Sequence, residues 1–167
     1  MRLILQNSRS NYITLKDELV ALELYLQMEG LRFKNKFGYT IDVDEGLDTN
    51  AILIPPMLIQ PYIENAIWHG LMTKTNGEPG RVELTIRKQN DNLLCTIADN
   101  GIGRKKAAEL KENKSSNHKR SMGMQITEER MEIINKLYNL NTSVRIYDIE
   151  NEQGEAMGTR IELIIPI

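Results

Sequence analysis

Three short clusters of polar residues and glycines could carry chemistry in this chain. The first is QPYIENAIWHG, residues 60–70. It places the acid Glu64, the amide Asn65 and the imidazole His69 on one expected helix, where the last two would share a face because they are four residues apart. An amide oxygen suits Mg²⁺, which prefers oxygen ligands, and the imidazole could donate to a phosphate. The alternative is an ordinary helix end capped by His69 and Gly70.

The second cluster is DNGIG, residues 99–103, which directly follows an apolar, strand-like run. The ionised carboxylate of Asp99 accepts hydrogen bonds and cannot donate them, which suits an exocyclic amine such as that of adenine. Gly101 and Gly103 would let the backbone approach a flat ligand closely. The alternative is a strand-to-helix turn, because Asp, Asn and Gly favour turns for local reasons.

The third cluster is SMGM, residues 121–124, at the junction between a polar stretch and an expected helix. A helix N-terminus offers unpaired N–H groups to phosphate, so Ser121 and Gly123 could border an anion. The preceding residues 111–121, KENKSSNHKRS, contain no large apolar residue and are expected to form a mobile loop. The chain has neither the GxxxxGK[ST] nor the GxGxxG motif, so the common phosphate and dinucleotide loops are excluded.

The composition of the chain restricts its size class, its partners and its metal chemistry. The chain has 167 residues, of which 41 % are hydrophobic, enough for one domain with a real core. The net charge of -2 does not indicate nucleic acid as a partner. A single cysteine, Cys95, excludes an internal disulfide and disfavours a structural zinc site. We expect no membrane span and no signal peptide within these residues.

The first half of the chain is expected to supply helices on either side of a strand. Apolar spacing of three and four residues predicts a helix over 15–33, and Thr14 followed by Asp17 resembles a capping box at its start. Alternation predicts a strand over 39–43. A second helix is expected over 57–71, after an apolar stretch that ends in two prolines.

The second half is expected to consist mainly of hairpins and helices. Alternating patterns predict strands at the following positions: 81–88, 93–98, 142–149 and 159–165. Helices are expected over 104–112 and 124–140. The sequence therefore predicts an α+β fold, a two-layer sandwich with helices on one face of a mixed, mostly antiparallel sheet.

The order and spacing of the three clusters resemble the GHKL ATPase and kinase superfamily, with its Bergerat-type ATP-binding fold. IENAIWHG looks like the N box, DNGIG like the G1 box and SMGM like the G2 box. GTRIELIIP resembles the closing strand, so the resemblance covers roughly residues 50–167. The leading segments TLKDELVALELYLQMEGLRF and IPPMLIQPYIENAIWHG are similar to LytS-type sensor histidine kinases and extend the match over nearly the whole chain.

The resemblance implies a role for each matched residue. Asn65 would ligate Mg²⁺ and Asp99 would bind the adenine amine of ATP. The remaining residues would line the nucleotide site, namely Gly101 and Gly103 at the adenine, Ser121 and Gly123 at the phosphates, and Thr159 at the adenine end of the pocket. Residues 111–121 would be the ATP lid. Glu64 and His69 match the catalytic box, without a defined role.

Three positions depart from the superfamily pattern. Trp68 stands where a lysine or arginine is common, and Ser121 stands where a first glycine is common, which would weaken phosphate contacts. Pro61 occupies the position of the glutamate that activates water in hydrolysing members. Because proline cannot act as a base, the resemblance favours a histidine protein kinase that transfers phosphate to an external acceptor.

The resemblance also implies what accompanies this domain. The phosphoacceptor histidine is expected upstream of residue 1, because His69 belongs to the nucleotide site and His118 to the lid. Residues 1–36 would be a linker and leading helix, and 37–167 the ATP-binding catalytic domain. The parent would be a homodimeric sensor in the bacterial inner membrane, with this domain in the cytoplasm and a response regulator as partner.

Two rival functions are compatible with the same residues. One is an ATP-hydrolysing or serine-kinase member of the superfamily, which Pro61 argues against. The other is a degenerate domain that binds a protein partner and no nucleotide, for which Trp68 and Ser121 leave room. The intact DNGIG motif argues against the second.

Overall fold

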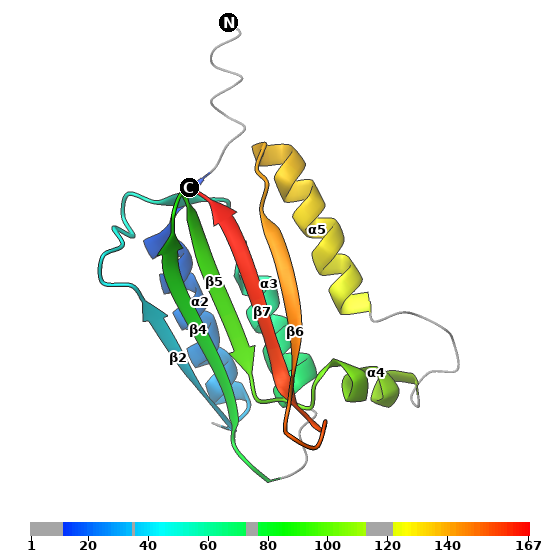
Figure 1. The fold of residues 1–167 in the computed structure, drawn as a ribbon. Helices are drawn as coiled ribbons and strands as arrows, with labels where there is room; N and C mark the ends of the chain where they lie inside the picture. Colours follow the sequence, from blue (N-terminus) through cyan, green and yellow to red (C-terminus); the bar gives the residue numbers. More distant parts are fainter. Residues whose placement is uncertain (1–11, 35, 73–76, 113–121) are drawn as a thin grey trace, which may run out of the picture.

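The structure is a computed structural model that describes residues 12–34, 36–72, 77–112 and 122–167. Its main strands are β2 Phe37–Val43, β4 Gly80–Gln89, β5 Asn92–Asp99, β6 Ser143–Glu150 and β7 Ala156–Pro166. They form one sheet in the order β2-β4-β5-β7-β6 (Figure 1). The pair β2–β4 is parallel and the other three pairs are antiparallel. The predicted mixed, mostly antiparallel sheet is therefore confirmed.

Helices cover one face of this sheet. This layer contains α2 Leu15–Arg32, α3 Gln60–Asn65, the π-helical segment η1 Ala66–Leu71 and α5 Met122–Tyr138. Helix α4 Arg104–Glu112 lies beyond the end of β6 (Figure 1). In Figure 1 the ribbons of α2 and α3 lie behind the strands, and α5 lies beyond the β6 edge. Two short strands, β1 Ile13–Thr14 and β3 Leu53–Ile54, pair antiparallel beside them. The two-layer α+β sandwich predicted from the sequence is confirmed.

The core lies between the sheet and the helices, because every second side chain of a strand points to this face. Leu84, Ile86 and Ile97 are fully or almost fully buried there, and Met131 and Ile134 of α5 join the same cluster. The two layers thus share one hydrophobic core.

The single cysteine faces this core. Cys95 is completely buried on β5, and burial raises the pKa of its thiol to about 12. Because the thiolate is the reactive form, this side chain is packed and chemically inert.

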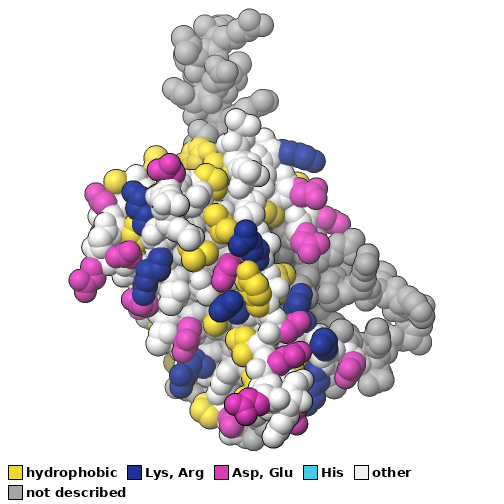
Figure 2. All heavy atoms as spheres, in the orientation of Figure 1, with side chains coloured by type: hydrophobic (Ala, Val, Ile, Leu, Met, Phe, Trp, Pro, Cys, Tyr) yellow, Lys and Arg dark blue, Asp and Glu magenta, His cyan; other side chains and the backbone are white. Residues whose placement is uncertain are grey.

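The other face of the sheet is open and polar. Figure 2 shows this face with acidic and basic side chains interspersed among a few apolar ones. Arg87 of β4 pairs with Asp42 of β2. The guanidinium of Arg160 lies over the ring of Tyr147 at 4.7 Å, and the Tyr147 hydroxyl donates to Glu162 at 3.2 Å. Exposed pairs of this kind contribute little stability, so this face is a solvated surface.

Helix α2 begins at the predicted cap. The Thr14 hydroxyl accepts a hydrogen bond from the Asp17 N–H at 3.1 Å, which satisfies a donor that has no partner inside the helix. Leu15, Leu22 and Leu26 are buried against the core. The helix ends at Arg32, one residue before the predicted end.

The helix expected over 57–71 begins later, at Gln60. Met57 has a positive φ of 56°, which is incompatible with a right-handed helix. The buried Glu18 carboxylate on α2 accepts hydrogen bonds from the N–H groups of Met57 and Ile59 at 2.9 and 3.2 Å. Arg130 of α5 donates to the Met57 carbonyl at 3.3 Å. Contacts from two other helices therefore fix where this helix starts, and local sequence does not show them.

In the second half, the predicted elements are present with shifted ends. Helix α5 is two residues earlier at both ends than predicted, and Asn139 with a φ of 51° follows its last turn. Strand β7 begins at Ala156, before the predicted 159, because β6 and β7 stay paired up to a bulge at Ile149 and Glu150. Residues 111 and 112 of the predicted loop belong to α4, and 113–121 lie outside the described residues.

Candidate functional site

The buried carboxylate at the end of β5 is the centre of the candidate site. The Asp99 residue is only 7 % exposed. Its Oδ1 accepts a hydrogen bond from the Gly101 N–H at 2.8 Å. Burial raises its pKa to about 6, while backbone hydrogen bonds from Gly101 and Thr159 pull that pKa down. A carboxylate held away from water in this way gains strongly from any further donor, because its charged form lacks solvation.

Two glycine backbones pack against each other and against this carboxylate. A Cβ on Gly101 would lie 2.4 Å from the Cα of Gly70, and a Cβ on Gly70 would lie 2.8 Å from Asp99 Oδ1. The Ile102 N–H donates to the Gly70 carbonyl at 3.3 Å. The structure thus brings the end of the first sequence cluster into contact with the second.

Two more glycines complete this region. Gly158 of β7 has a φ of 144°, and a Cβ there would lie 1.9 Å from the Asp99 carbonyl oxygen. Gly103 has a φ of 76°, and a Cβ there would lie 2.8 Å from that of Ala156. Sequence reasoning assigned Gly103 and missed Gly158. The sequence signal that could have found it is that Gly158 directly precedes Thr159, which was assigned to the site. In the structure Thr159 pairs with Asp99.

The asparagine of DNGIG anchors the loop to the neighbouring strand. Asn100 Oδ1 accepts from the Arg81 N–H at 2.7 Å, and its Nδ2 donates to the Pro79 carbonyl at 3.2 Å. The Asn100 N–H donates to the Arg81 carbonyl at 3.3 Å. The loop therefore continues the sheet's hydrogen bonding for one residue beyond β5.

The segment that carries Gly70 is a π-helix. The Met72 N–H donates to the Ile67 carbonyl at 3.0 Å, five residues back. Gly70 lies inside this segment, and Met72 is its C-cap. The alternative in which His69 and Gly70 form the cap is therefore wrong. Such segments are rare and are frequent at functional sites.

The polar residues of the first cluster lie on both sides of the change from α to π geometry. Glu64 accepts a hydrogen bond from Gln60 Nε2 at 2.8 Å. Asn65 is the last residue of α3 and His69 lies in η1, and both are half-buried. Pro61 lies in the first turn of α3, where a missing N–H costs nothing.

The tryptophan of this cluster packs on the end of α2. The Trp68 and Phe33 rings meet edge to face with centroids 5.1 Å apart. The guanidinium of Arg32 lies 4.9 Å above the Trp68 ring. The Arg32 guanidinium is therefore held against Trp68, which stands where the superfamily commonly has a lysine or arginine.

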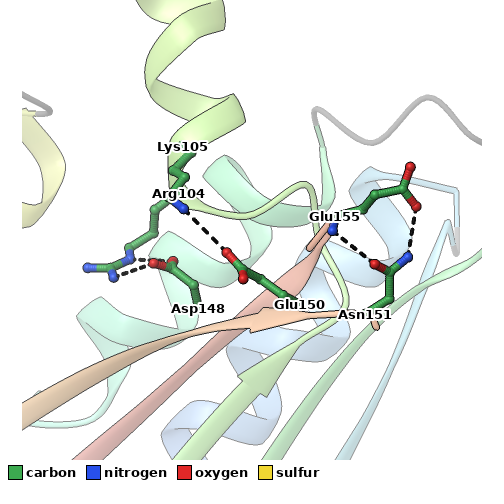
Figure 3. A network of polar contacts seen from close by, with 6 residues as sticks. All are labelled: Arg104, Lys105, Asp148, Glu150, Asn151 and Glu155. Atoms are coloured by element: carbon green, nitrogen blue, oxygen red, sulfur yellow. Dashed lines mark hydrogen bonds and ion pairs between the residues drawn. The ribbon is translucent and has the colours of Figure 1, made fainter. Parts of the chain in front are cut away.

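Helix α4, which follows DNGIG, is attached to β6 by two ion pairs (Figure 3). Arg104 Nε and Nη2 donate to the two carboxylate oxygens of Asp148, both at 2.7 Å. Lys105 Nζ lies 3.3 Å from Glu150 Oε1. The hydrogen bonds from Arg104 lower the pKa of Asp148. Neither arginine nor aspartate was singled out from the sequence, where nothing marks them as a pair.

The third cluster is only partly described. Gly123 is the second residue of α5, so the helix does begin at this motif as predicted. Ser121 lies outside the described residues.

Solved structures define the class of this fold. The catalytic domain of histidine kinase ThkA matches with a TM-score of 0.59 at 13% identity, over 93% of this chain and 95% of that chain. ThkA has also been solved in complex with response regulator protein TrrA, where the match has a TM-score of 0.56 at 15% identity and covers 99% of this chain and 45% of that chain. The fold is that of a histidine kinase catalytic domain.

Sequence relatives narrow the class. Sensor protein LytS of Staphylococcus saprophyticus subsp. saprophyticus is 29% identical over 163 residues, which are 97% of this chain and 26% of that protein. Sensor histidine kinase BtsS of Escherichia coli (strain K12) is 34% identical over 91 residues, or 54% of this chain and 16% of that protein. The chain thus spans about a quarter or less of these two curated relatives. No family model matches it. The predicted resemblance to LytS-type sensor histidine kinases is confirmed.

No helix in the described ranges is long and apolar enough to cross a membrane.

Proposed function

We propose that this chain binds Mg-ATP and presents the γ-phosphate to a histidine outside its 167 residues. It would then act as the ATP-binding catalytic domain of a two-component sensor histidine kinase. The observation that carries the proposal is the buried Asp99 carboxylate within a wall of glycine backbone. The backbone N–H groups of Gly101 and Thr159 hydrogen-bond to this carboxylate, which offers about four acceptor sites and so keeps capacity for an amine donor.

The residues around Asp99 fit adenine. Gly70 and Gly101 present backbone without side chains, so a flat ring could approach them closely. Thr159 lies opposite Asp99 on β7, in reach of the same ligand edge. We assign Asp99 to the exocyclic amine, and Gly101, Gly103 and Thr159 to the ring.

The phosphate end would be formed by the first and third clusters. Asn65 supplies the hard amide oxygen that suits Mg²⁺. Gly123 is the second residue of α5, and the backbone N–H groups of Gly123 and Ser121 would donate to phosphate oxygens. When bound, Mg²⁺ neutralises charge on the phosphates during transfer. Glu64 and His69 lie before and after Asn65 on the same pair of helical segments, and we include them in the catalytic box without a defined role.

Transfer to an acceptor is favoured over hydrolysis by Pro61. It stands where a water-activating carboxylate would be needed, and it has no titratable group. The acceptor histidine would belong to the upstream part of a homodimeric parent anchored in the inner membrane, with this domain on the cytoplasmic side. By analogy with the complex of ThkA and TrrA, a response regulator would receive the phosphate.

Calorimetric titration of this chain with ATP, with and without Mg²⁺, tests the proposal. Binding by the wild type should weaken at least about tenfold in Asp99→Asn, which turns one acceptor oxygen into a donor. Asp42→Asn is the matched control, because the Asp42 side chain on β2 is 62% exposed and pairs with Arg87 of β4. It should bind like the wild type. No binding by the wild type at millimolar ATP would refute nucleotide recognition.

A second measurement separates transfer from hydrolysis. In the longer kinase, Asp99→Asn or Asn65→Ala should abolish autophosphorylation, because both remove contacts to the nucleotide. Steady release of phosphate by this chain alone would instead support the hydrolytic rival.

A further inference from the structure

Helix α2 contacts the helical segment formed by α3 and η1 toward both of its ends. At the start of this segment, the Glu18 carboxylate accepts hydrogen bonds from the N–H groups of Met57 and Ile59. Toward the other end, the Trp68 ring packs edge to face on the ring of Phe33, which is the C-cap of α2. The residues of the first sequence cluster therefore lie on a segment that one neighbouring helix holds at two points.

A tyrosine of α2 takes part in the second of these contacts. Burial raises the pKa of the Tyr25 hydroxyl, whereas the hydrogen bond that it accepts from the indole N–H of Trp68 lowers this pKa. Nearby carboxylates, Glu64 among them, raise the same pKa, and the positive charge of Arg32 lowers it. Tyr25 therefore bonds to Trp68 and lies in the field of Glu64, the residue directly before Asn65.

The π-helical segment η1 is held on two different sides. Residues two apart on a helix do not share a face. Trp68 attaches η1 to α2, and Gly70 attaches another side of it to Asp99 and Gly101. Because a rotation of η1 about its own axis would break one of these attachments, the two together fix that rotation. Asn65 directly precedes η1 and lies about one turn before Trp68, so its direction is fixed with it.

We propose that Trp68 is a positioning residue, which through its contacts with α2 holds Asn65 in the direction needed to ligate the magnesium ion of Mg-ATP. The inference rests on the proposed function, because that function gives Asn65 the magnesium ion to bind. The indole is well restrained for this purpose. Phe33 is its ring partner, the Arg32 guanidinium lies 4.9 Å over it, and Tyr25 accepts from its N–H. Turning the indole would break at least one of these contacts.

The exposure of these side chains separates positioning from simple stabilisation. Trp68 is 38% exposed, and the Arg32 side chain is 61% exposed. Contacts between partly exposed groups add little to the stability of a domain. Magnesium binding is more sensitive to position, because this ion requires ligands in near-ideal octahedral geometry. Loss of the Trp68 contacts should therefore affect the metal end of the site more than the fold.

Calorimetric titration of the full chain with ATP, once with Mg²⁺ and once with EDTA, tests the inference. The ratio of the Kd in EDTA to the Kd in Mg²⁺, hereafter the magnesium gain, reports the metal end of the site. The Kd in EDTA alone reports the adenine end around Asp99. Trp68→Ala should lower the magnesium gain about tenfold, as loss of a group that supports a metal ligand does. It should leave the Kd in EDTA within about twofold of the wild type.

Tyr147→Ala is the matched control for the loss of an aromatic ring. Tyr147 on β6 is 37% exposed, and the Arg160 guanidinium lies 4.7 Å over its ring, so its setting closely matches that of Trp68. It lies on the open face of the sheet, and Tyr147→Ala should leave both Kd values unchanged. Tyr25→Phe and Arg32→Gln each remove one partner of the indole and keep its ring. Each should lower the magnesium gain about threefold.

The outcomes separate this inference from the proposed function. A magnesium gain in Trp68→Ala equal to that of the wild type would overturn the inference and leave the proposed function intact. Equal weakening of ATP binding in Mg²⁺ and in EDTA would show that Trp68 only stabilises the domain, which also overturns it. If Trp68→Ala does not fold, an unchanged magnesium gain in both Tyr25→Phe and Arg32→Gln decides against the inference. A wild type that binds no ATP in either condition would refute the proposed function and this inference together.

Discussion

The DNGIG loop is held in two different ways on its two sides. On the side of β5, Gly70 and Gly101 meet backbone to backbone next to the buried Asp99. On the side of α4, Arg104 and Lys105 reach the carboxylates of β6 across a partly exposed surface. The first contact has no side chain that could adjust, and the second consists only of side chains. The comparison indicates that the glycines fix the position of the DNGIG loop, whereas the ion pairs only orient helix α4, which follows it.

The two sides should differ most in their tolerance of one added carbon. Gly101→Ala would place a Cβ 2.4 Å from the Gly70 backbone, which cannot move without displacing η1. We expect a loss of about 3 kcal/mol or more in the free energy of unfolding, with loss of ATP binding. Urea denaturation measures the first effect. Gly38→Ala on β2 is the control, because nothing lies within 4 Å of its Cβ. If the free energy of unfolding of Gly101→Ala stayed within about 0.5 kcal/mol of the wild type, the packing of Gly101 on Gly70 would not be rigid.

The buried carboxylate should also make stability depend on pH in an unusual direction. Its folded pKa of about 6 lies above its ordinary value of 3.8. The folded state therefore binds more protons between these values, and its stability falls as pH rises from about 4 to 6 and then levels off. For this one carboxyl group, the free energy of unfolding should fall by up to about 3 kcal/mol over this pH range.

Asp99→Asn isolates this effect from other titrating groups. The free energy of unfolding of the wild type relative to Asp99→Asn should decrease between pH 4 and pH 7 in denaturation series. A constant difference over that range would show that the carboxylate is not protonated more readily in the folded state.

The ion pair of Arg104 should show the opposite pH dependence and a smaller effect. Arg104→Gln removes a two-point contact between partly exposed groups, with an expected loss of about 1 kcal/mol at neutral pH. Because the pKa of Asp148 is lowered in the folded state, this stabilisation is present at neutral pH and is lost as pH falls through that pKa. Denaturation of wild type and variant at pH 7 and at acid pH measures it, and a difference that grows on acidification would exclude this explanation.

Lys105→Gln should have the smallest effect of all. Its partner Glu150 and the lysine itself are both largely exposed, so the pair is screened by water. We expect a change within about 0.5 kcal/mol in the same denaturation assay. A loss equal to that of Arg104→Gln would mean that the two ion pairs act as one network.

Local patterns predicted the elements, but distant contacts set their ends and the details of the site. Alternation over 81–88 and 93–98 was enough for the hairpin, and the position of DNGIG after a strand was correct. The late start at Gln60 was not predictable, because Glu18 holds the preceding backbone from another helix. The glycine pair was missed as a contact for the same reason. The sequence suggested only the alternative of a helix cap for Gly70, and the fold is what brings it to Gly101.

The π-helical segment has a consequence for how the chain tolerates changes in length. Each hydrogen bond in it spans five residues, one more than in an α-helix. The segment can thus be regarded as a helix that has absorbed one extra residue. Deleting a residue between Ala66 and Gly70 would let regular α-helical winding return and would rotate the Gly70 backbone away from Asp99. The register of this helix against the sheet is therefore encoded by residue count as much as by residue identity.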